Sequence, residues 1–376
     1  MTNNHQYFAN ACQRRRLTHS VCSCYTLIKS LTLGLFVSLG IVNPSFSSDF
    51  YTLQQWITPF TLKADKRSIN YTWEQTSSSS KSICAIIPPS STSYWFAVNY
   101  GLVKKARQLD VDLKVFHVLD RFNFNEHDKL IERCLAYKPR SLIISAALGT
   151  QVSQNLQSVK NKPTVLLVGK NIATNGIIAS SATAYHDIGS QLAKYMNKNH
   201  AIDNIKQTVM FPGDQSEQFV NSFVTGFKSI INPNKYQLEN IIYTSNSYVQ
   251  IKAKLTEYLN NHLNTTVIVG SALVSQAAVE VLEEMSLSDE VQIISYELSA
   301  QVYRDIKRGN VVASISNLAV IQGLLAIDLA IKLESNPSAT HISPLATIVD
   351  GDNVQKFDIS YAFAPYGYRE TLEVNR

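Results

Sequence analysis

Residues 82–116, SICAIIPPSSTSYWFAVNYGLVKKARQLDVDLKVF, contain a strand, a helix and a second strand, and this order decides the fold. The run SICAII is short and continuously apolar, which is typical of a strand buried on both faces of a sheet. The helix is marked by an apolar face, since residues at spacings of 3, 4, 4 and 3 are Trp95, Val98, Leu102, Ala106 and Leu109. The segment DLKVFHVL then predicts the next strand of a parallel sheet.

The same alternation continues along most of the chain. The further strand candidates are SLIISAA, TVLLVG and GIIAS in a first series, and TVMFPG, NIIYT, TVIVGS, VQIISY and VVASIS in a second. Amphipathic helices separate them, so parallel sheets with right-handed crossovers are expected. About ten strands would bring a single twisted sheet to its limit, and the sequence therefore predicts an α/β protein with two doubly wound lobes.

The expected domain organisation follows from this alternation. A serine-rich joint, TSSSSKS, ends an N-terminal arm over 48–81. Lobe 1 is expected over 82–186 plus 317–343, and lobe 2 over 187–316 plus 344–376. A helix over 318–333 and a strand over 345–349 are expected to cross back between the lobes. His186 is interpreted as a hinge residue and Asp187 as the N-cap of the following helix.

The first 47 residues are interpreted as a signal peptide. Three arginines, Arg14 to Arg16, precede an apolar run from Leu31 to Val42, and small residues follow at Ser45 and Ser47. Cleavage is expected after Ser47, although the long basic region leaves a retained anchor as an alternative. Removing this segment lowers the net charge from +5 to +1, so a nearly neutral body is exported and nucleic-acid binding is not expected.

Five cysteines divide between the signal and the body. Cys12, Cys22 and Cys24 leave with the signal, whereas Cys84 and Cys134 remain. Two cysteines in an oxidising compartment favour one disulfide, which would stabilise the fold by about 4 kcal/mol in the chain-entropy model. Two buried free thiols are the alternative.

Motifs of catalysis, metal binding and cofactor binding are missing from the sequence. It contains no G-x-G-x-x-G after a strand, no P-loop, no H-E-x-x-H and no G-x-S-x-G. We therefore expect no enzyme, no cofactor and no metal site.

Two segments carry a family resemblance, SYWFAVNYGLVKKARQLDVDLKV and LSAQVYRDIKRGNVVASISNLAVIQGLLAIDLAI. On these segments the chain resembles the type I periplasmic binding proteins, from about Cys84 to Tyr368. The resemblance implies two Rossmann-like lobes joined by three crossovers, a periplasmic location in a Gram-negative cell, and a ligand in the cleft. It also matches the positions of Cys84 and Cys134.

Ligand clefts of this kind lie at the carboxyl ends of strands, where Tyr94 and Trp95 are located. Both rings could instead belong to the core, since Trp95 begins the apolar helical face.

Within that family the chain is similar to members that sense trimethylamine N-oxide (TMAO) with a TorS-like sensor histidine kinase. The resemblance implies a ligand site of Thr92, Tyr94, Trp95, Arg121, Tyr185 and Glu297. Four of these positions depart from the TMAO pattern: Thr92 replaces an acid, Arg121 and Glu297 replace tyrosines, and Tyr185 replaces a tryptophan. Arg121 and Glu297 would bring two charges into the cleft, where they could pair with each other when the lobes close or hold a ligand with a carboxylate and a cation. Alternatively, both charges are solvated at the cleft mouth.

The expected function is a ligand-binding sensor that docks on the periplasmic domain of the TorS-like kinase. A substrate-binding subunit of an ABC importer for a sugar or small polar solute is the alternative, although such sites usually carry more polar groups than the candidates here. A DNA-binding repressor is disfavoured because an export signal stands where the DNA-binding headpiece would be.

Overall fold

The structure is a computed structural model of the 376-residue chain, and it describes residues 51–59, 65–75, 82–90, 92–120, 123–145, 152, 154–170, 177–199 and 204–375. The expected signal peptide, residues 1–47, lies outside these residues. None of the helices in the described ranges is long and apolar enough to span a bilayer.

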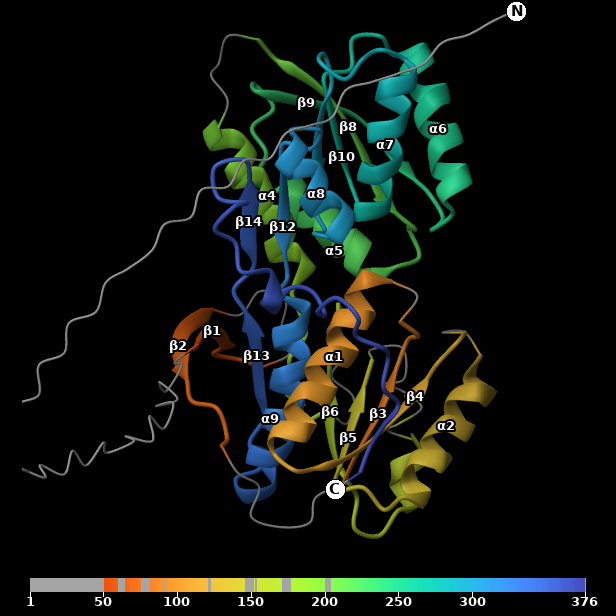
Figure 1. Cartoon of the computed structure of the whole chain (residues 1–376), viewed down its shortest axis with the longest axis vertical. Coiled ribbons are helices and arrows are strands. Elements are labelled where there is room, and N and C mark those ends of the chain that lie inside the picture. Colours follow the sequence, from red (N-terminus) through yellow and green to blue (C-terminus); the bar gives the residue numbers. More distant parts are fainter. Residues whose placement is uncertain are drawn as a thin grey trace, which may run out of the picture. The chain divides into compact units, whose positions relative to one another are not determined.

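Lobe 1 is built on a nine-stranded sheet with the order β15-β4-β3-β5-β6-β7-β13-β1-β2, drawn in the lower half of Figure 1. Its first parallel unit is β3 followed by helix α1 and β4. The strands are β1 (Tyr51–Trp56), β2 (Lys66–Tyr71), β3 (Ser82–Ile87), β4 (Asp112–His117), β5 (Ser141–Ile144), β6 (Thr164–Leu167), β7 (Ala179–Ser180), β13 (Thr340–Pro344) and β15 (Glu373–Val374). The helices are α1 (Ser93–Gln108), α2 (Phe124–Ala136) and α9 (Ala319–Ser335), with a 3-10 turn η2 (Leu156–Ser158).

Lobe 2 is built on a six-stranded sheet with the order β14-β12-β11-β10-β8-β9. Its strands pair in parallel except for β14, which runs antiparallel to β12. The strands are β8 (Lys206–Gly213), β9 (Tyr236–Tyr243), β10 (Val267–Gly270), β11 (Gln292–Ser295), β12 (Ala313–Ser316) and β14 (Thr347–Asp350). The helices are α4 (Tyr185–Asn199), α5 (Gln218–Lys228), α6 (Tyr248–Asn261), α7 (Ala272–Glu284) and α8 (Ala300–Arg308), with η3 (Ile359–Tyr361) after β14. The predicted pair of parallel α/β sheets is confirmed.

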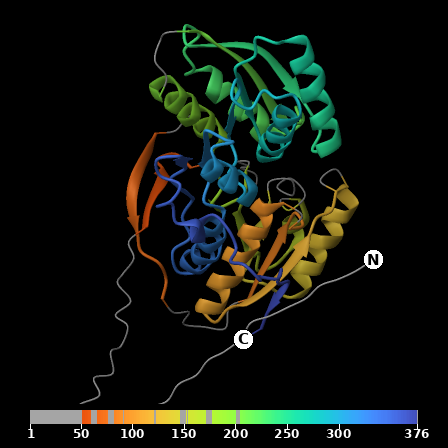
Figure 2. The same cartoon turned by 45° about the horizontal axis from the view of Figure 1, so that its top comes forward.

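The segment expected to be an N-terminal arm contributes two strands to lobe 1. Strands β1 and β2 form an antiparallel hairpin, and β1 pairs with β13 at the edge of the larger sheet. Figure 2 shows this hairpin in orange. Since an uncovered edge strand exposes a row of unpaired backbone groups, the hairpin protects β13. Part of the segment assigned to the arm thus belongs to the sheet of lobe 1.

The C-terminal tail also departs from the expected boundary, which assigned 344–376 to lobe 2. After β14 the chain returns to lobe 1, where β15 pairs antiparallel with β4. The Tyr368 hydroxyl donates to the Asn99 side-chain oxygen at 2.6 Å, the Asn99 side-chain amide donates to the Thr371 carbonyl at 3.0 Å, and Lys114 forms an ion pair with Glu373. The tail is therefore a fourth connection between the sheets, beside those after β7, β12 and β13. A two-residue strand has no periodicity that a sequence reading could detect.

Helices α1 and α9 lie side by side on one face of the larger sheet, as Figure 1 shows. Gly101 and Gly323 make this approach close enough for backbone contact. A Cβ atom built on Gly101 would lie 2.2 Å from the Val320 carbonyl oxygen, and one on Gly323 would lie 2.3 Å from that of Val98. Only glycine fits at either position, and the crossing fixes both helices relative to the sheet.

The predicted disulfide is confirmed between Cys84 on β3 and Cys134 on α2. The two Cα atoms are 5.8 Å apart, within the usual range for a disulfide. Both cysteines are fully buried in an apolar cluster, so the bond fastens α2 to the centre of the sheet.

His341 on β13 is buried where the hairpin joins the sheet. Its ring stacks on Trp56 with the centroids 3.8 Å apart, and its Nε2 donates to the Ala182 carbonyl at 3.0 Å. Burial lowers the pKa of His341 to about 4, and the positive charge of Lys66 acts in the same direction. The ring is therefore neutral at pH 7.

Acidification is expected to destabilise the fold through His341. His341 binds a proton near pH 6.5 in the unfolded chain but only near pH 4 in the folded one. The free energy of unfolding is therefore expected to decrease by up to about 3 kcal/mol as pH falls from about 6.5 to about 4. Urea unfolding at a series of pH values, with wild type and His341→Gln, measures the difference. His186→Gln, which removes a partly exposed histidine, is the control. Equal pH slopes for wild type and His341→Gln would contradict the prediction.

Candidate functional site

A cavity of about 770 Å³ lies at the seam between the lobes. It is lined by residues that include Thr92, Tyr94 and Lys170 from lobe 1 and Phe219 and Glu297 from lobe 2. Strands β6, β11 and β12 end at this cavity, and helices α1, α5, α7 and α8 begin there. The reason is that the carboxyl ends of parallel strands lie at one edge of each sheet. Its volume is within the range of small-molecule sites.

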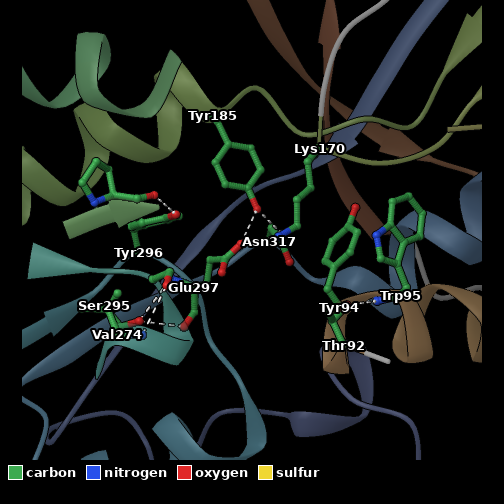
Figure 3. Close-up of polar contacts among 12 residues, drawn as sticks. Thr92, Tyr94, Trp95, Lys170, Tyr185, Val274, Ser295, Tyr296, Glu297 and Asn317 are labelled. Carbon is green, nitrogen blue, oxygen red and sulfur yellow. Dashed lines mark hydrogen bonds and ion pairs between the residues drawn. The ribbon is translucent and has the colours of Figure 1, made fainter. Parts of the chain in front are cut away.

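The Lys170 ammonium lies among three aromatic rings inside this seam. Its Nζ is 4.9 Å from the ring centroid of Tyr94, 4.8 Å from that of Phe219 and 5.8 Å from that of Tyr185. Figure 3 shows the lysine side chain reaching between Tyr94 and Tyr185. Aromatic faces attract cations at these distances, so these three rings, which we call the aromatic box, form a cation site.

Glu297 supplies the negative charge of the site. Its carboxylate forms an ion pair with Lys170, and its Oε1 accepts a hydrogen bond from the Tyr185 hydroxyl at 3.3 Å. The two charged side chains come from different sheets, since Lys170 follows β6 and Glu297 follows β11. Both are about four-fifths buried, at 19% and 20% exposure, so the pair is screened less than a surface pair.

A chain of hydrogen bonds connects the two tyrosines behind the box. The Tyr94 hydroxyl donates to Gln322 Oε1 at 2.8 Å, and the fully buried Gln322 donates from Nε2 to the Asn317 carbonyl at 2.8 Å. The Asn317 side-chain amide donates to the Tyr185 hydroxyl at 3.2 Å. Both rings are therefore held in fixed orientations by Asn317, which follows β12, and by Gln322 in the first turn of α9.

Both phenols stay protonated. Burial raises the pKa of Tyr94 well above its usual value, and the negative charge of Glu297 raises it further, against a smaller opposite effect of the Gln322 hydrogen bond. The pKa of Tyr185 is raised by the same two causes in the same order. The box therefore holds neutral phenols and one ion pair, while Asp214 and Glu217, which also line the cavity, add negative charge to it.

Of the residues expected from the sequence, Tyr94 and Glu297 line the cavity. Tyr185 is fully buried behind it, with its hydroxyl against Glu297. Thr92 also lines the cavity, and its hydroxyl accepts from the Trp95 backbone amide at 3.4 Å as the N-cap of α1. A threonine at this position therefore starts the helix. Arg121 lies outside the described residues.

Trp95 takes a different place from Tyr94. It is not among the described residues that line the cavity, and its ring meets that of Tyr94 edge-on with centroids 5.0 Å apart. A Cβ atom built on Gly169 would lie 3.1 Å from the Trp95 ring, and Gly169 has φ of +138°, a value that side-chain-bearing residues rarely adopt. Trp95 therefore supports Tyr94 and packs on the backbone that presents Lys170.

Sequence reasoning missed Lys170, Phe219 and Asn317 as site residues. Lys170 directly follows the strand TVLLVG and Asn317 directly follows VVASIS, so the carboxyl-end rule could have selected both. Phe219 lies on an apolar helical stripe, and only its position at the start of α5 distinguishes it. No group of three or more His, Cys, Asp or Glu in the described part of the chain is arranged to hold a metal ion.

The family model, a curated relative and solved structures all relate this chain to periplasmic or solute-binding proteins. The periplasmic binding protein domain family matches residues 84–337. The periplasmic protein TorT of Escherichia coli (strain K12) is 26% identical over 341 residues, covering 90% of this chain and 95% of TorT. An ABC transporter solute-binding protein from Bradyrhizobium sp. BTAi1, solved with bis-tris, superimposes with a TM-score of 0.78 at 22% identity, covering 86% of this chain and 98% of that one. The complex of the TorS sensor domain with TorT in the presence of TMAO has a matching chain with a TM-score of 0.70 at 22% identity, covering 78% and 99%.

Proposed function

Because this chain belongs to the periplasmic binding protein family, we propose that it is a periplasmic sensor that closes on TMAO or a related small zwitterionic solute and regulates a TorS-like sensor histidine kinase. Residues 84–337, which match the family, include the cavity-lining side chains Tyr94, Lys170, Phe219 and Glu297. Members of this family bind ligands.

The aromatic box carries the proposal for the ligand. Tyr94, Tyr185 and Phe219 surround a positive charge, and Glu297 stands beside it. Ring faces and a carboxylate are the groups that recognise a methylated or primary ammonium. In the proposed ligand site Tyr94, Phe219, Glu297 and Thr92 line the cavity, and Tyr185 and Trp95 support them from behind. Arg121, which the resemblance adds, remains a proposal from the sequence.

The relatives support the proposal for the partner. The curated relative TorT covers 90% of this chain, and TorT is solved in complex with the TorS sensor domain both without ligand and with TMAO. A ligand regulates such a complex only through different affinities for the open and closed lobes. The charged pair across the seam gives this chain a contact that differs between these two states.

A substrate-binding subunit of an ABC importer is the second candidate. The Bradyrhizobium protein that supports it is an ABC transporter solute-binding protein, and two solute-binding proteins solved in complex with D-arabinose share the fold. The polar cavity residues Asn246, Gln276 and Gln301 suit hydroxyl groups.

Binding to the kinase distinguishes the two candidates. The purified protein is immobilised and titrated with the periplasmic domain of the TorS-like kinase from the same genome, with TMAO, with glycine betaine and without solute. The sensor proposal expects a complex whose affinity changes with solute. If no complex forms under any condition, and the protein stimulates a permease from the same genome, the importer is correct.

Replacing Tyr94 with alanine is expected to weaken binding of a cationic or zwitterionic solute about 10-fold, because one face of the aromatic box is lost. Tyr94→Phe keeps the ring and removes only the bond to Gln322, so it is expected to bind within about 3-fold of wild type. Calorimetric titration with TMAO and glycine betaine measures both variants. Equal losses for Tyr94→Ala and Tyr94→Phe would show that the hydroxyl, rather than the ring face, holds the solute.

A further inference from the structure

The Lys170–Glu297 ion pair crosses the seam at the place where a ligand cation would lie. Lys170 belongs to lobe 1 and Glu297 to lobe 2, and the lysine ammonium occupies the aromatic box. The aromatic box is thus occupied by an ammonium group of the chain itself. A ligand that enters the box must displace the ammonium of Lys170 from Glu297 and from the rings.

We propose that Lys170 and Glu297 are the specificity-determining pair of the site, and that they select a zwitterion carrying both an ammonium and a carboxylate. The ligand ammonium replaces that of Lys170 beside Glu297 and the rings, and the ligand carboxylate takes the displaced Lys170 as its counter-ion. The inference rests on the proposed function, since it assigns the ligand to the same cavity.

Charge compensation within the Lys170–Glu297 pair favours a zwitterion over a ligand with a single charge. Both side chains are about four-fifths buried, and a buried charge that loses its partner is strongly unfavourable. A ligand that is only a cation pairs with Glu297 and takes this partner from Lys170. A ligand that is only an anion pairs with Lys170 and leaves Glu297 without its partner. A carboxylate-bearing zwitterion compensates both charges of the pair at once. Asp214 and Glu217, which also line the cavity, add negative charge that favours the cationic end of the ligand.

TMAO fits this arrangement less well than a carboxylate-bearing zwitterion. Its oxygen can accept a hydrogen bond from Lys170, but the oxygen is bonded directly to the methylated nitrogen. Glu297 and Lys170 come from opposite lobes, and the cavity of about 770 Å³ is far larger than a ligand of five heavy atoms requires. A ligand whose opposite charges are separated by one or more carbons spans the two side chains better.

The surroundings of the pair suit both ends of such a ligand. The ammonium end meets Glu297 and the faces of Tyr94 and Phe219, as the Lys170 ammonium does here. The carboxylate end can turn toward Lys170 and toward the first turns of α7 and α8, which begin at the lining residues Ser271 and Ser299. Helix N-termini favour negative charge, which adds to the attraction of Lys170.

A thermal-shift panel tests the ligand class directly. The purified protein is heated with each standard L-α-amino acid, glycine betaine, TMAO, choline, isobutyrate and D-ribose. Stabilisation by at least one carboxylate-bearing zwitterion, with none by choline or isobutyrate, is the expected result. Stabilisation by TMAO alone overturns the charge-pair inference and leaves the proposed sensor function standing. Stabilisation by D-ribose alone overturns both, and stabilisation by nothing in the panel also overturns the inference.

Charge-removing variants test the two residues. For the zwitterion that binds wild type, Lys170→Met and Glu297→Gln are each expected to weaken binding about 30-fold or more in calorimetric titration. Lys170→Met is expected to bind TMAO at least as well as wild type, because no tethered ammonium then competes for the box. Lys162→Met is the matched control: Lys162 is exposed and precedes β6, whereas Lys170 follows it.

The double variant Lys170→Met with Glu297→Gln keeps the test valid if the single variants do not fold. It leaves neither charge unpaired, so it is expected to fold and still to lose zwitterion binding by at least as much as either single variant. Wild-type affinity in the double variant, or in a folded Lys170→Met, would overturn the inference.

Discussion

Replacing Asp328 with alanine is expected to lower the free energy of unfolding by about 4 kcal/mol, the largest effect of any single substitution considered. Asp328 on α9 is fully buried, and its carboxylate lies 3.0 Å from the Lys105 ammonium and 3.2 Å from that of Lys332. It also accepts from the Tyr71 hydroxyl at 2.7 Å and from the Glu74 backbone amide at 2.9 Å. Alanine would leave the buried Lys105 without a counter-ion and free the end of the N-terminal hairpin.

A second substitution separates the charge effect from the cavity effect. If the unpaired Lys105 dominates the loss, adding Lys105→Met to Asp328→Ala should recover part of it, because no buried charge then remains. Asp289→Ala removes an exposed acid and is expected to change stability by less than about 0.5 kcal/mol. Urea unfolding followed by circular dichroism measures all three. A loss below about 1 kcal/mol for Asp328→Ala would contradict the prediction.

Removing the disulfide is expected to cost about 4 kcal/mol. The Cys84–Cys134 bond has a sequence separation of 50 residues, and a cross-link of that length strongly restricts the unfolded chain. Replacing both residues with alanine leaves no thiol in the apolar cluster under α2. The melting temperature is therefore expected to fall in the double variant and in the reduced wild type.

Reduction provides the control for the disulfide. A thiol reductant should lower the melting temperature of wild type and leave that of the double alanine variant unchanged. Neither cysteine lines the cavity, so solute affinity well below the melting temperature should stay within about 2-fold of wild type. If the reductant destabilises both proteins equally, the disulfide does not carry the effect.

The two stability predictions concern different parts of lobe 1 and support the site indirectly. Asp328 fastens the segment after β2 to α1 and α9, the helices whose first turns carry Tyr94 and Gln322. The disulfide holds α2 against β3, the strand that leads into α1. Both fix the frame from which the aromatic box projects.

Local patterns in the sequence determined the fold class. The apolar run at Cys84 and the helical face from Trp95 to Leu109 are properties of neighbouring residues, and a helix or strand period can be counted within one segment. The alternation of such segments requires parallel sheets in two lobes, which the structure has. The candidate residues Tyr94, Tyr185 and Glu297 follow from the family resemblance, and Tyr94 follows also from its place after the first buried strand.

Only the tertiary structure decided which of those residues meet. Lys170 and Glu297 are separated by 127 positions, and Tyr94 and Gln322 by 228, so no periodicity connects either pair. Their contacts depend on the order of strands in two sheets and on how the lobes close over the cavity. The pairing of β15 with β4 and of β1 with β13 is likewise set by which sheet edges remain open once the rest has folded. The sequence by itself therefore determined the secondary structure and the family. Only the tertiary structure placed the Lys170 ammonium in the aromatic box, because long-range packing, not local spacing, brings these groups together.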